Sequence, residues 1–551
     1  MEDKGQEGLA HFVEHMAFNG TKNFKKLELV NYLESIGMRF GPDLNAYTSF
    51  DETVYMLQVP LKDSGHLDTA FKILRDWAQD VSFEDEEIEK ERGVVLEEWR
   101  LGRGASRRIW DQQFPVLFHK SKYADRLPIG LPEVIEKGHP DLLRKFYKDW
   151  YRPDLMAIIA VGDADPKKIE SMIKKTFGDI PKRENVRERV AFPVPDHDEA
   201  LVSIVTDAEA TRNSVGVFFK REVEPIKSRD DYRRLMKEML FQTMFNQRLD
   251  EIRKQPDAPF LAAYGGKGSF VKTKSAFMLQ ALVKDGGVKN GLEAVLTEAE
   301  RVRQFGFTAS ELERAKVARL RAVQVAHKER ETTPSRNFAS DYVTSFLEDT
   351  TEPGIDAELE MHETFLKTIT IAELNQLARD WVSEDNRVVL ASGPANPELK
   401  MPAKADLLAL FDQVRKSKLE AWADDAGEGP LVPEELSSGK VNGKVAKRKK
   451  IKKLDAEVWT LSNGIKMILK KTDFKSDEVL FSAFSRGGHS LSRDAHFISA
   501  YSADGVMYES GLGNFSQVQL RKKLAGKVVT LNPYIQELQE GLDGRCSPED
   551  L

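Results

Sequence analysis

The segment LAHFVEHMAF, residues 9–18, constrains the start of the chain more than any other part of the sequence. His11 and His15 lie four residues apart in this apolar stretch, so a helix would project both imidazoles from one face. Two imidazole nitrogens at that separation suit one tetrahedral zinc ion. Two unpartnered histidines would be costly to bury in an apolar helix. The spacing therefore predicts a helix that holds a metal.

Glu14 lies between the two histidines and shares their side of the expected helix. A carboxylate beside bound zinc can take a proton from the metal's water and deliver it to a leaving amine. Zinc lowers the pKa of that water to about 7 and polarises a carbonyl. The order HxxEH is the inverted form of the common HExxH metallopeptidase motif. With 10 histidines in 551 residues, the motif alone is also compatible with structural histidines.

A catalytic zinc needs a third protein ligand and an open position. Residues 84–100, EDEEIEKERGVVLEEWR, have the pattern of a helix with acidic residues along one face. This spacing does not choose Glu91 from Glu84, Glu87 or Glu98. Most of these carboxylates are expected to belong to a solvated face.

Composition limits the remaining function classes. The chain is 41% hydrophobic and 31% charged, which is typical of a globular protein, and its length suggests roughly three or four domains. A net charge of -7 gives no indication of nucleic acid as a partner. No stretch approaches the ~20 apolar residues of a membrane helix. One cysteine, Cys546, excludes a disulfide within the chain.

The pattern of apolar residues predicts an α+β protein with four regions. They are residues 1–190, 195–420, a linker at 421–456, and 457–551. Within the first region we expect helices over 9–36, 66–80 and 84–100, a strand in NAYTSFDETVYMLQVP, and a buried strand in RPDLMAIIAVGD. The linker contains the basic run 447–453, which we interpret as a solvated tether because no aromatic residues interleave it.

Two segments near the start of the chain have counterparts near its end. AHFVEH at 10–15 matches AHFISA at 495–500, and NFKKLELVNYL at 23–33 matches NFSQVQLRKKL at 514–524. Their common order favours an internal duplication. Ser499 and Ala500 replace the glutamate and second histidine, so the second copy is expected to keep a helix without the metal site.

HFVEHMAFNGT followed by IEKERGVVLEEW resembles the M16 peptidases, the pitrilysin, insulysin and mitochondrial-processing-peptidase group. The resemblance implies that Glu91 is the third zinc ligand and that Glu84 supports the site without touching the metal. It also implies that GPDLNAYTSFDETVY, with Asn45 and Ala46, is the edge strand that binds substrate. YRPDLMAIIAVGD matches a further family segment.

The same resemblance implies repeated sheet-and-helix domains of the inverzincin type, also called LuxS/MPP-like, two complete and a third begun. Its layout is most similar to large bacterial members built from two halves. It implies one Zn²⁺ per chain, held by His11, His15 and Glu91, with Glu14 as general base. The expected activity is endopeptidase cleavage of peptides or unfolded segments, with a second half of the same chain closing the chamber. The sequence is expected to be truncated at both ends, and the bacterial periplasm or cell envelope is the expected compartment.

Two alternatives remain open at this stage. One is a non-catalytic binding or assembly subunit of the same fold. The other is a zinc hydrolase or lyase that acts on small molecules. The sequence does not indicate cleavage preference or oligomeric state.

Overall fold

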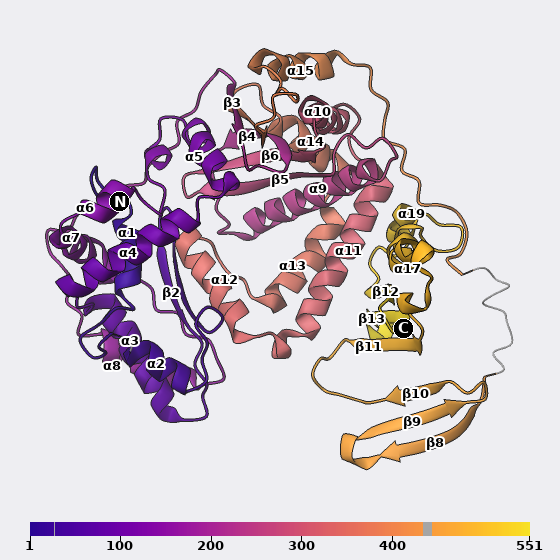
Figure 1. The fold of residues 1–551 in the computed structure, drawn as a ribbon, viewed down its shortest axis with the longest axis horizontal. Coiled ribbons are helices and arrows are strands. Elements are labelled where there is room, and N and C mark those ends of the chain that lie inside the picture. Colours follow the sequence, from indigo (N-terminus) through magenta and orange to yellow (C-terminus); the bar gives the residue numbers. More distant parts are fainter. Residues whose placement is uncertain (27, 433–442) are drawn as a thin grey trace. The chain divides into compact units, whose positions relative to one another are not determined.

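The computed structural model describes residues 1–26, 28–432 and 443–551, and these form two units (Figure 1). The first unit consists of residues 1–306, 334–352 and 375–420, and the second of residues 307–333, 353–374 and 421–551. The sequence regions expected at 1–190 and 195–420 thus contribute most of the first unit. Part of the expected linker, 433–442, lies outside the described residues.

The first 190 residues are mainly helical. The elements are α1 (Leu9–Met16), α2 (Glu28–Ser35), β1 (Leu44–Thr48), β2 (Thr53–Leu57), α3 (Ser64–Gln79), α4 (Asp85–Leu101), α5 (Ala105–Leu117), α6 (Pro132–Lys137), α7 (Pro140–Trp150) and α8 (Pro166–Phe177). Local sequence explains several helix starts. The side chains of Asp63 and Asp165 accept hydrogen bonds from backbone N–H groups in the first turns of α3 and α8. α7 and α8 begin with proline, whose fixed φ suits the first helical position.

Helix α1 lies in the core of this region. Phe12 and Val13 are completely buried, as are Ile88 and Val95 of α4. The same hydrophobic cluster includes residues of α3 and α7. Apolar residues at helical spacing in α1 and α4 therefore bring the two motif-bearing helices together.

β1 and β2 form an antiparallel hairpin rather than one long strand, with Ala46 opposite Tyr55. The prediction of a buried strand in RPDLMAIIAVGD was wrong. A short 3-10 helix, Pro153–Leu155, occupies the start of this segment, and the described residues 156–163 form no strand. Val161 is 36% exposed. An apolar run indicates burial, but a strand also needs a partner for its backbone groups, and the sequence pattern does not reveal that partner.

The remainder of the first unit is built on a five-stranded sheet. Its strands are β3 (Leu201–Asp207), β4 (Asn213–Arg221), β5 (Ala262–Val271), β6 (Lys274–Val283) and β7 (Arg387–Pro394), in the order β3-β7-β4-β6-β5. β3 and β7 are parallel, and the other pairs are antiparallel. The accompanying helices are α9 (Arg229–Arg253), α10 (Val288–Phe305), α12 (Ser335–Glu348), α14 (Ile371–Trp381) and α15 (Lys404–Lys416). The part of α14 from Asn375 onward belongs to the first unit.

Alternating side chains of this sheet point to two different helix layers. Phe218 packs in a cluster with Leu117 of α5, whereas Phe277 contacts Phe241 and Phe245 of α9. The side-chain period of two in a strand explains why both faces are apolar. Helix α5 thus joins the metal-motif region to the sheet. Arg108 of α5 adds a bidentate pair with Asp207 of β3, at 2.6 and 2.7 Å.

The second unit contains two small sheets. Its elements are α11 (Ala309–Lys328), α13 (Ile355–Thr368), β8 (Val445–Ile451), β9 (Ala456–Leu461), β10 (Lys466–Leu469), β11 (Val479–Arg486), α17 (Phe497–Tyr501), α18 (Ala503–Glu509), α19 (Gln517–Lys523), β12 (Val529–Ile535) and β13 (Gln539–Cys546). The sheet orders are β10-β9-β8 and β11-β13-β12, all antiparallel.

The expected linker at 421–456 is not a tether throughout, because β8 lies within it and pairs with β9. The side chains of β8 are nevertheless almost all exposed, so the basic run is solvated as expected. Composition indicates where side chains meet water and says little about backbone pairing. β9 also pairs antiparallel with β10, so the three strands form one sheet. Among the described residues, no helix is long and apolar enough to cross a membrane.

Candidate metal centre

Helix α1 is fixed at both ends. The side chain of buried Glu2 accepts hydrogen bonds from the backbone N–H groups of Gly8 at 3.0 Å and Ala10 at 2.9 Å. It thereby satisfies donors that the first turn of a helix leaves unpaired. At the other end, the indole N–H of Trp77 donates to the carbonyl of Ala17 at 2.9 Å. These contacts hold the motif in place independently of any ligand.

Gly8 and Gly130 allow the chain to approach itself at the start of α1. Gly8 has a φ of 97°, and a Cβ added to it would lie 2.8 Å from the Cα atom of Gly130. Both the left-handed backbone and the close contact require glycine at this position.

Arg92 ties helix α4 to α6, and its guanidinium lies over the ring of Phe12 of α1, 5.8 Å from the ring centroid. This buried guanidinium donates to the carbonyls of Ile135 and Gly138 and, at 2.9 Å, to Glu89. These bonds fix the rotation of α4, so that Glu91 and Glu98, two turns apart, both face α1.

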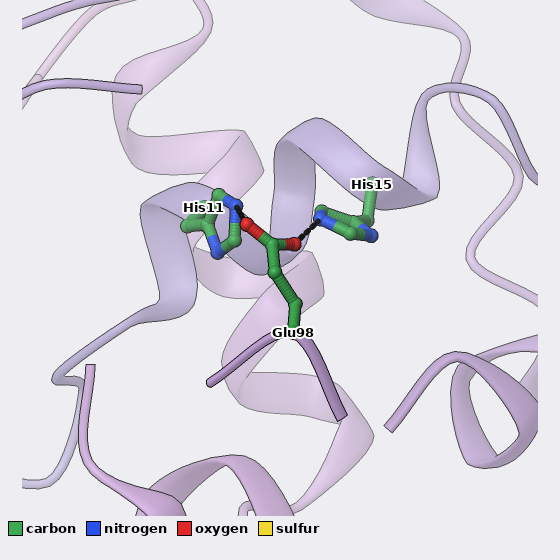
Figure 2. Close-up of side chains that lie close together, drawn as sticks. All are labelled: His11, His15 and Glu98. Carbon is green, nitrogen blue, oxygen red and sulfur yellow. Dashed lines mark hydrogen bonds and ion pairs between the residues drawn. The ribbon is translucent and has the colours of Figure 1, made fainter. Parts of the chain in front are cut away.

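The two motif histidines converge on one carboxylate (Figure 2). Nε2 of His11 lies 3.6 Å from one oxygen of Glu98, and Nε2 of His15 lies 3.1 Å from the other. Nδ1 of His15 contacts Glu91 at 2.7 Å. Nδ1 of His11 is buried and has no hydrogen-bond partner among the described residues. The histidines therefore direct their Nε2 atoms to one point.

The structure places Glu84, Glu91 and Glu98 differently from one another. One ligand atom each from His11, His15 and Glu98 lies within 4.8 Å of the others. Glu91 reaches only His15, through the nitrogen that does not face Glu98. Glu84 is exposed at the N-cap of α4 and makes no side-chain capping bond there. Sequence spacing had left Glu98 open as a ligand, and the family resemblance had favoured Glu91.

The donor set fits a zinc ion. Two imidazole nitrogens and one carboxylate are ligands that zinc takes at catalytic sites, where a fourth position stays open for water. A hydrogen bond from Nδ1–H of His15 to Glu91 would fix the tautomer that leaves Nε2 free to bind metal. The carboxylate of Glu98 now spans the gap between the two Nε2 atoms, where an ion would lie.

Glu14 is buried next to this cluster and points toward β1. Its carboxylate accepts a hydrogen bond from the hydroxyl of Thr48 at 2.5 Å. Burial raises the pKa of Glu14, although the bond from Thr48 and the charge of His15 oppose the rise. A carboxylate with a raised pKa suits proton transfer near neutral pH.

Asn45 and Ala46 lie in the same strand as Thr48. Asn45 is exposed, Ala46 is half-buried, and the side chain of Asn45 accepts from the backbone N–H of Ala46 at 3.0 Å. β2 pairs with one edge of β1, and within the described ranges no strand pairs with the other edge. The geometry permits an added strand and does not assign a role to either residue.

The two histidines differ in electrostatic environment. Burial, with a smaller effect from the charge of His15, lowers the pKa of His11 to about 4. Burial also acts to lower the pKa of His15, but the hydrogen bond and charge of Glu91, aided by Glu98 and Glu14, outweigh it, so the net shift is upward.

Paired imidazoles, a bridging carboxylate and a buried glutamate on an inverted motif define a zinc-metallopeptidase type of centre. Comparison with known families agrees. Residues 1–102 match the model "Insulinase (Peptidase family M16)", and residues 139–318 match "Peptidase M16 inactive domain". The chain belongs to peptidase family M16.

Named relatives match along the whole chain. The chain is 31% identical to an Arabidopsis thaliana protein named "Zinc protease PQQL-like", over 100% of this chain and 55% of the relative. It is 28% identical to "Probable zinc protease PqqL" of Escherichia coli, over 96% of this chain and 57% of the relative. The chain therefore spans little more than half the length of these relatives.

Solved structures show the same architecture. The crystal structure of the periplasmic protease PqqL from Escherichia coli matches with a TM-score of 0.72 and 25% identity, over 100% of this chain and 60% of that chain. The structure of the first half of that protease matches with a TM-score of 0.71 and 28% identity, over 77% of this chain and 91% of that chain. The α+β fold inferred from the sequence is confirmed.

Proposed function

We propose that this chain carries the catalytic centre of a zinc-dependent endopeptidase that hydrolyses peptides or unfolded protein segments. One observation carries the proposal. The Nε2 atoms of His11 and His15 and the carboxylate of Glu98 face one point, and a buried carboxylate, Glu14, lies beside them. Membership of family M16 supports it.

His11, His15 and Glu98 would hold the zinc, in place of the set with Glu91 that the resemblance suggested. Glu91 then orients His15 through Nδ1. When bound, zinc supplies an acidified water and polarises the carbonyl of the substrate. Glu14 would accept a proton from the attacking water and return it to the leaving amine, and Thr48 holds the Glu14 carboxylate in position.

The substrate in this proposal binds as an extended strand along β1. The free edge of β1 offers backbone groups, and Thr48 links that strand to Glu14. Asn45 and Ala46 are the residues proposed to contact the substrate backbone. Main-chain pairing would leave sequence preference to side-chain pockets.

Glu14→Gln tests the catalytic role. The amide keeps the size of the side chain but cannot accept the proton, so we expect turnover to fall by about 10²–10⁴-fold. Zinc content should stay at one per chain. Quenched peptides and small-molecule esters and amides should be assayed side by side on parental protein and variant.

The same assay separates the alternatives. Zinc binding without hydrolysis of any substrate in the parental protein would favour a non-catalytic binding subunit. Hydrolysis confined to small molecules would favour a hydrolase or lyase. Parental cleavage of peptides with an unchanged rate in Glu14→Gln would exclude Glu14 as the base.

We also propose that a second half, present in the longer relatives, closes the substrate chamber, and that the protein works in the bacterial periplasm. The named structural relative is a periplasmic protease, and another solved structure is described as the first half of that protease. In the second unit, large apolar side chains such as Leu480, Phe484 and Leu538 are 69–71% exposed. An exposed apolar face of this kind is typical of a surface that another segment covers. If so, the 551-residue chain binds zinc fully but cleaves peptides less efficiently than a longer chain containing the second half; equal kcat/KM would contradict this.

A further inference from the structure

A hollow of about 900 Å³ opens on the flank of α4 beside the candidate metal centre. Glu98 is shared by the hollow and the metal centre: its carboxylate faces the two histidines, and the residue lines the hollow. The other walls come from the second half of α4, the start of α5 and Ile129. A group in this hollow would therefore be next to a group held at the metal centre.

Most charged side chains around the hollow have partners of opposite charge. Lys90 pairs with Glu86 at 2.7 Å, and Arg107 pairs with Asp111 at 2.8 Å. Glu97 likewise pairs with Arg100, at 2.6 Å. These pairs offset the charges of Lys90, Glu97, Arg107 and Asp111, and they leave Glu98 and Arg103 as the other charged side chains of the wall.

Apolar side chains form much of the rest of the wall. Val94 is 51% exposed and Leu101 is 78% exposed, and both line the hollow. The guanidinium of Arg103 lies over the ring of Trp99, 4.4 Å from its centroid, and both residues line the hollow. Single exposed apolar residues are common, but a concave group of them with an aromatic ring is typical of a ligand pocket.

Gly93 keeps the hollow open. It lies inside α4, where glycine is destabilising relative to alanine, and a Cβ added there would meet no atom within 4 Å. No neighbouring atom therefore requires glycine at this position. A side chain larger than alanine would extend into the hollow.

We propose that this hollow is a subsite that receives a large apolar side chain of the substrate next to the bond that is cut. The proposal rests on the proposed peptidase function. Gly93, Val94 and Leu101 would determine which side chain fits, and none of them takes part in catalysis.

The test fills the hollow. Gly93→Leu should fold, because leucine favours a helix and the added atoms meet open space. Gly93→Ala is the matched control, since its single methyl leaves the hollow open. Peptides with Phe, Ala or Asp at each position flanking the cleaved bond are assayed on the zinc-loaded protein, and matching peptide hydroxamates are titrated by calorimetry.

For one flanking position, the parental protein should prefer Phe over Ala and Asp. Gly93→Leu should lower kcat/KM for the Phe peptide by about tenfold and weaken the Phe hydroxamate by a similar factor, because a filled pocket excludes a large side chain. The Ala peptide should be affected far less, and Gly93→Ala should lower kcat/KM for the Phe peptide less than Gly93→Leu does, because a single methyl fills little of the hollow.

Three results would overturn the subsite. They are equal effects of Gly93→Leu on the Phe and Ala ligands, no effect on either, and a parental preference for Asp at that position, which would point to recognition by Arg103. If the parental protein cleaves no peptide, the peptidase proposal fails, and the hydroxamate affinities alone then decide whether the hollow binds a side chain.

Discussion

The two copies of the AHF motif begin with the same residues and have different surroundings. In the first copy, α1 runs over eight residues, and Phe12 and Val13 are fully buried. In the second, α17 covers five residues, and Phe497 and Ile498 are 42% and 72% exposed. Both sequences form a helix, as the repeat predicted.

The difference lies in what packs against the helix. Helices α3, α4 and α7 share a core with α1, and α4 supplies Glu91 and Glu98. Within the described part of the chain, only the first copy brings together three side chains able to hold a metal. A histidine on a helix is thus a candidate ligand only where a neighbouring helix supplies a carboxylate beside it.

The largest expected effect is the loss of bound zinc when His11 or His15 is replaced. His496, the equivalent of His11 in the second copy, provides the comparison. His11→Ala or His15→Ala should remove most of the zinc, because the remaining two ligands make an incomplete site. His496→Ala should leave the content at one zinc per chain, because His496 is exposed. Metal analysis of the three purified variants makes the comparison. Full zinc content in both first-copy variants would refute the proposed centre.

The carboxylates of α4 give the next largest effect. Glu98→Gln should lose zinc almost as completely as the histidine variants. Glu91→Gln should bind zinc roughly 10–100-fold more weakly, since Glu91 orients His15 without touching the ion. Glu84→Gln tests the supporting role that the resemblance implies for Glu84, and we expect the smallest loss of the three because Glu84 is exposed at the helix start. The reverse order for Glu98 and Glu91 in a zinc competition titration would restore the ligand set implied by the resemblance.

Core packing should also separate the two copies. Phe12→Ala removes a buried ring and should destabilise the first unit by about 3–5 kcal/mol. Phe497→Ala should cost about 1 kcal/mol, because the exposed ring loses mainly its contacts with His489 and Tyr501. Calorimetric melting of metal-free protein measures both. Similar losses would show that α17 is as well covered in solution as α1.

Local sequence was sufficient for much of the fold. Apolar spacing located α1, α2, α3 and α4, and the duplicated segments led to α17 and α19. It failed where the outcome depends on distant parts of the chain. Among the described residues, the apolar run after Pro153 pairs with no other strand, whereas basic residues 447–450 form part of strand β8. Hydrophobicity reports burial, whereas strands depend on a second segment.

The candidate site shows the same limit. The motif determined that His11, Glu14 and His15 share a helix, and helical spacing placed Glu91 and Glu98 on one face of α4. These two glutamates are seven residues apart and look equivalent in sequence. The packing of α4 against α1 determines which of them lies between the Nε2 atoms. No pattern within α4 contains that information.

The smallest expected effect is in the pH dependence of zinc binding. A histidine binds zinc only when neutral, so a proton on His15 competes with the metal. The pKa of His15 is raised, so the proton is retained to a higher pH, and zinc affinity should increase as pH rises through that pKa. Below it, affinity should fall by about tenfold per pH unit, the value for one competing proton. His11, whose pKa is lowered to about 4, adds no dependence near neutral pH.

Glu91→Gln tests the cause of this dependence. The variant removes the hydrogen-bonded charge that raises the pKa of His15, while burial continues to lower it. The pH at which zinc binding weakens should therefore shift downward, even though the greatest affinity at high pH is lower. Competition with a chromophoric chelator between about pH 5 and 9 covers the titration of a histidine. His496→Ala serves as the matched control and should reproduce the parental curve. An unshifted curve in Glu91→Gln would mean that Glu91 does not set the protonation of His15, and the orienting role proposed for it would then have no electrostatic support.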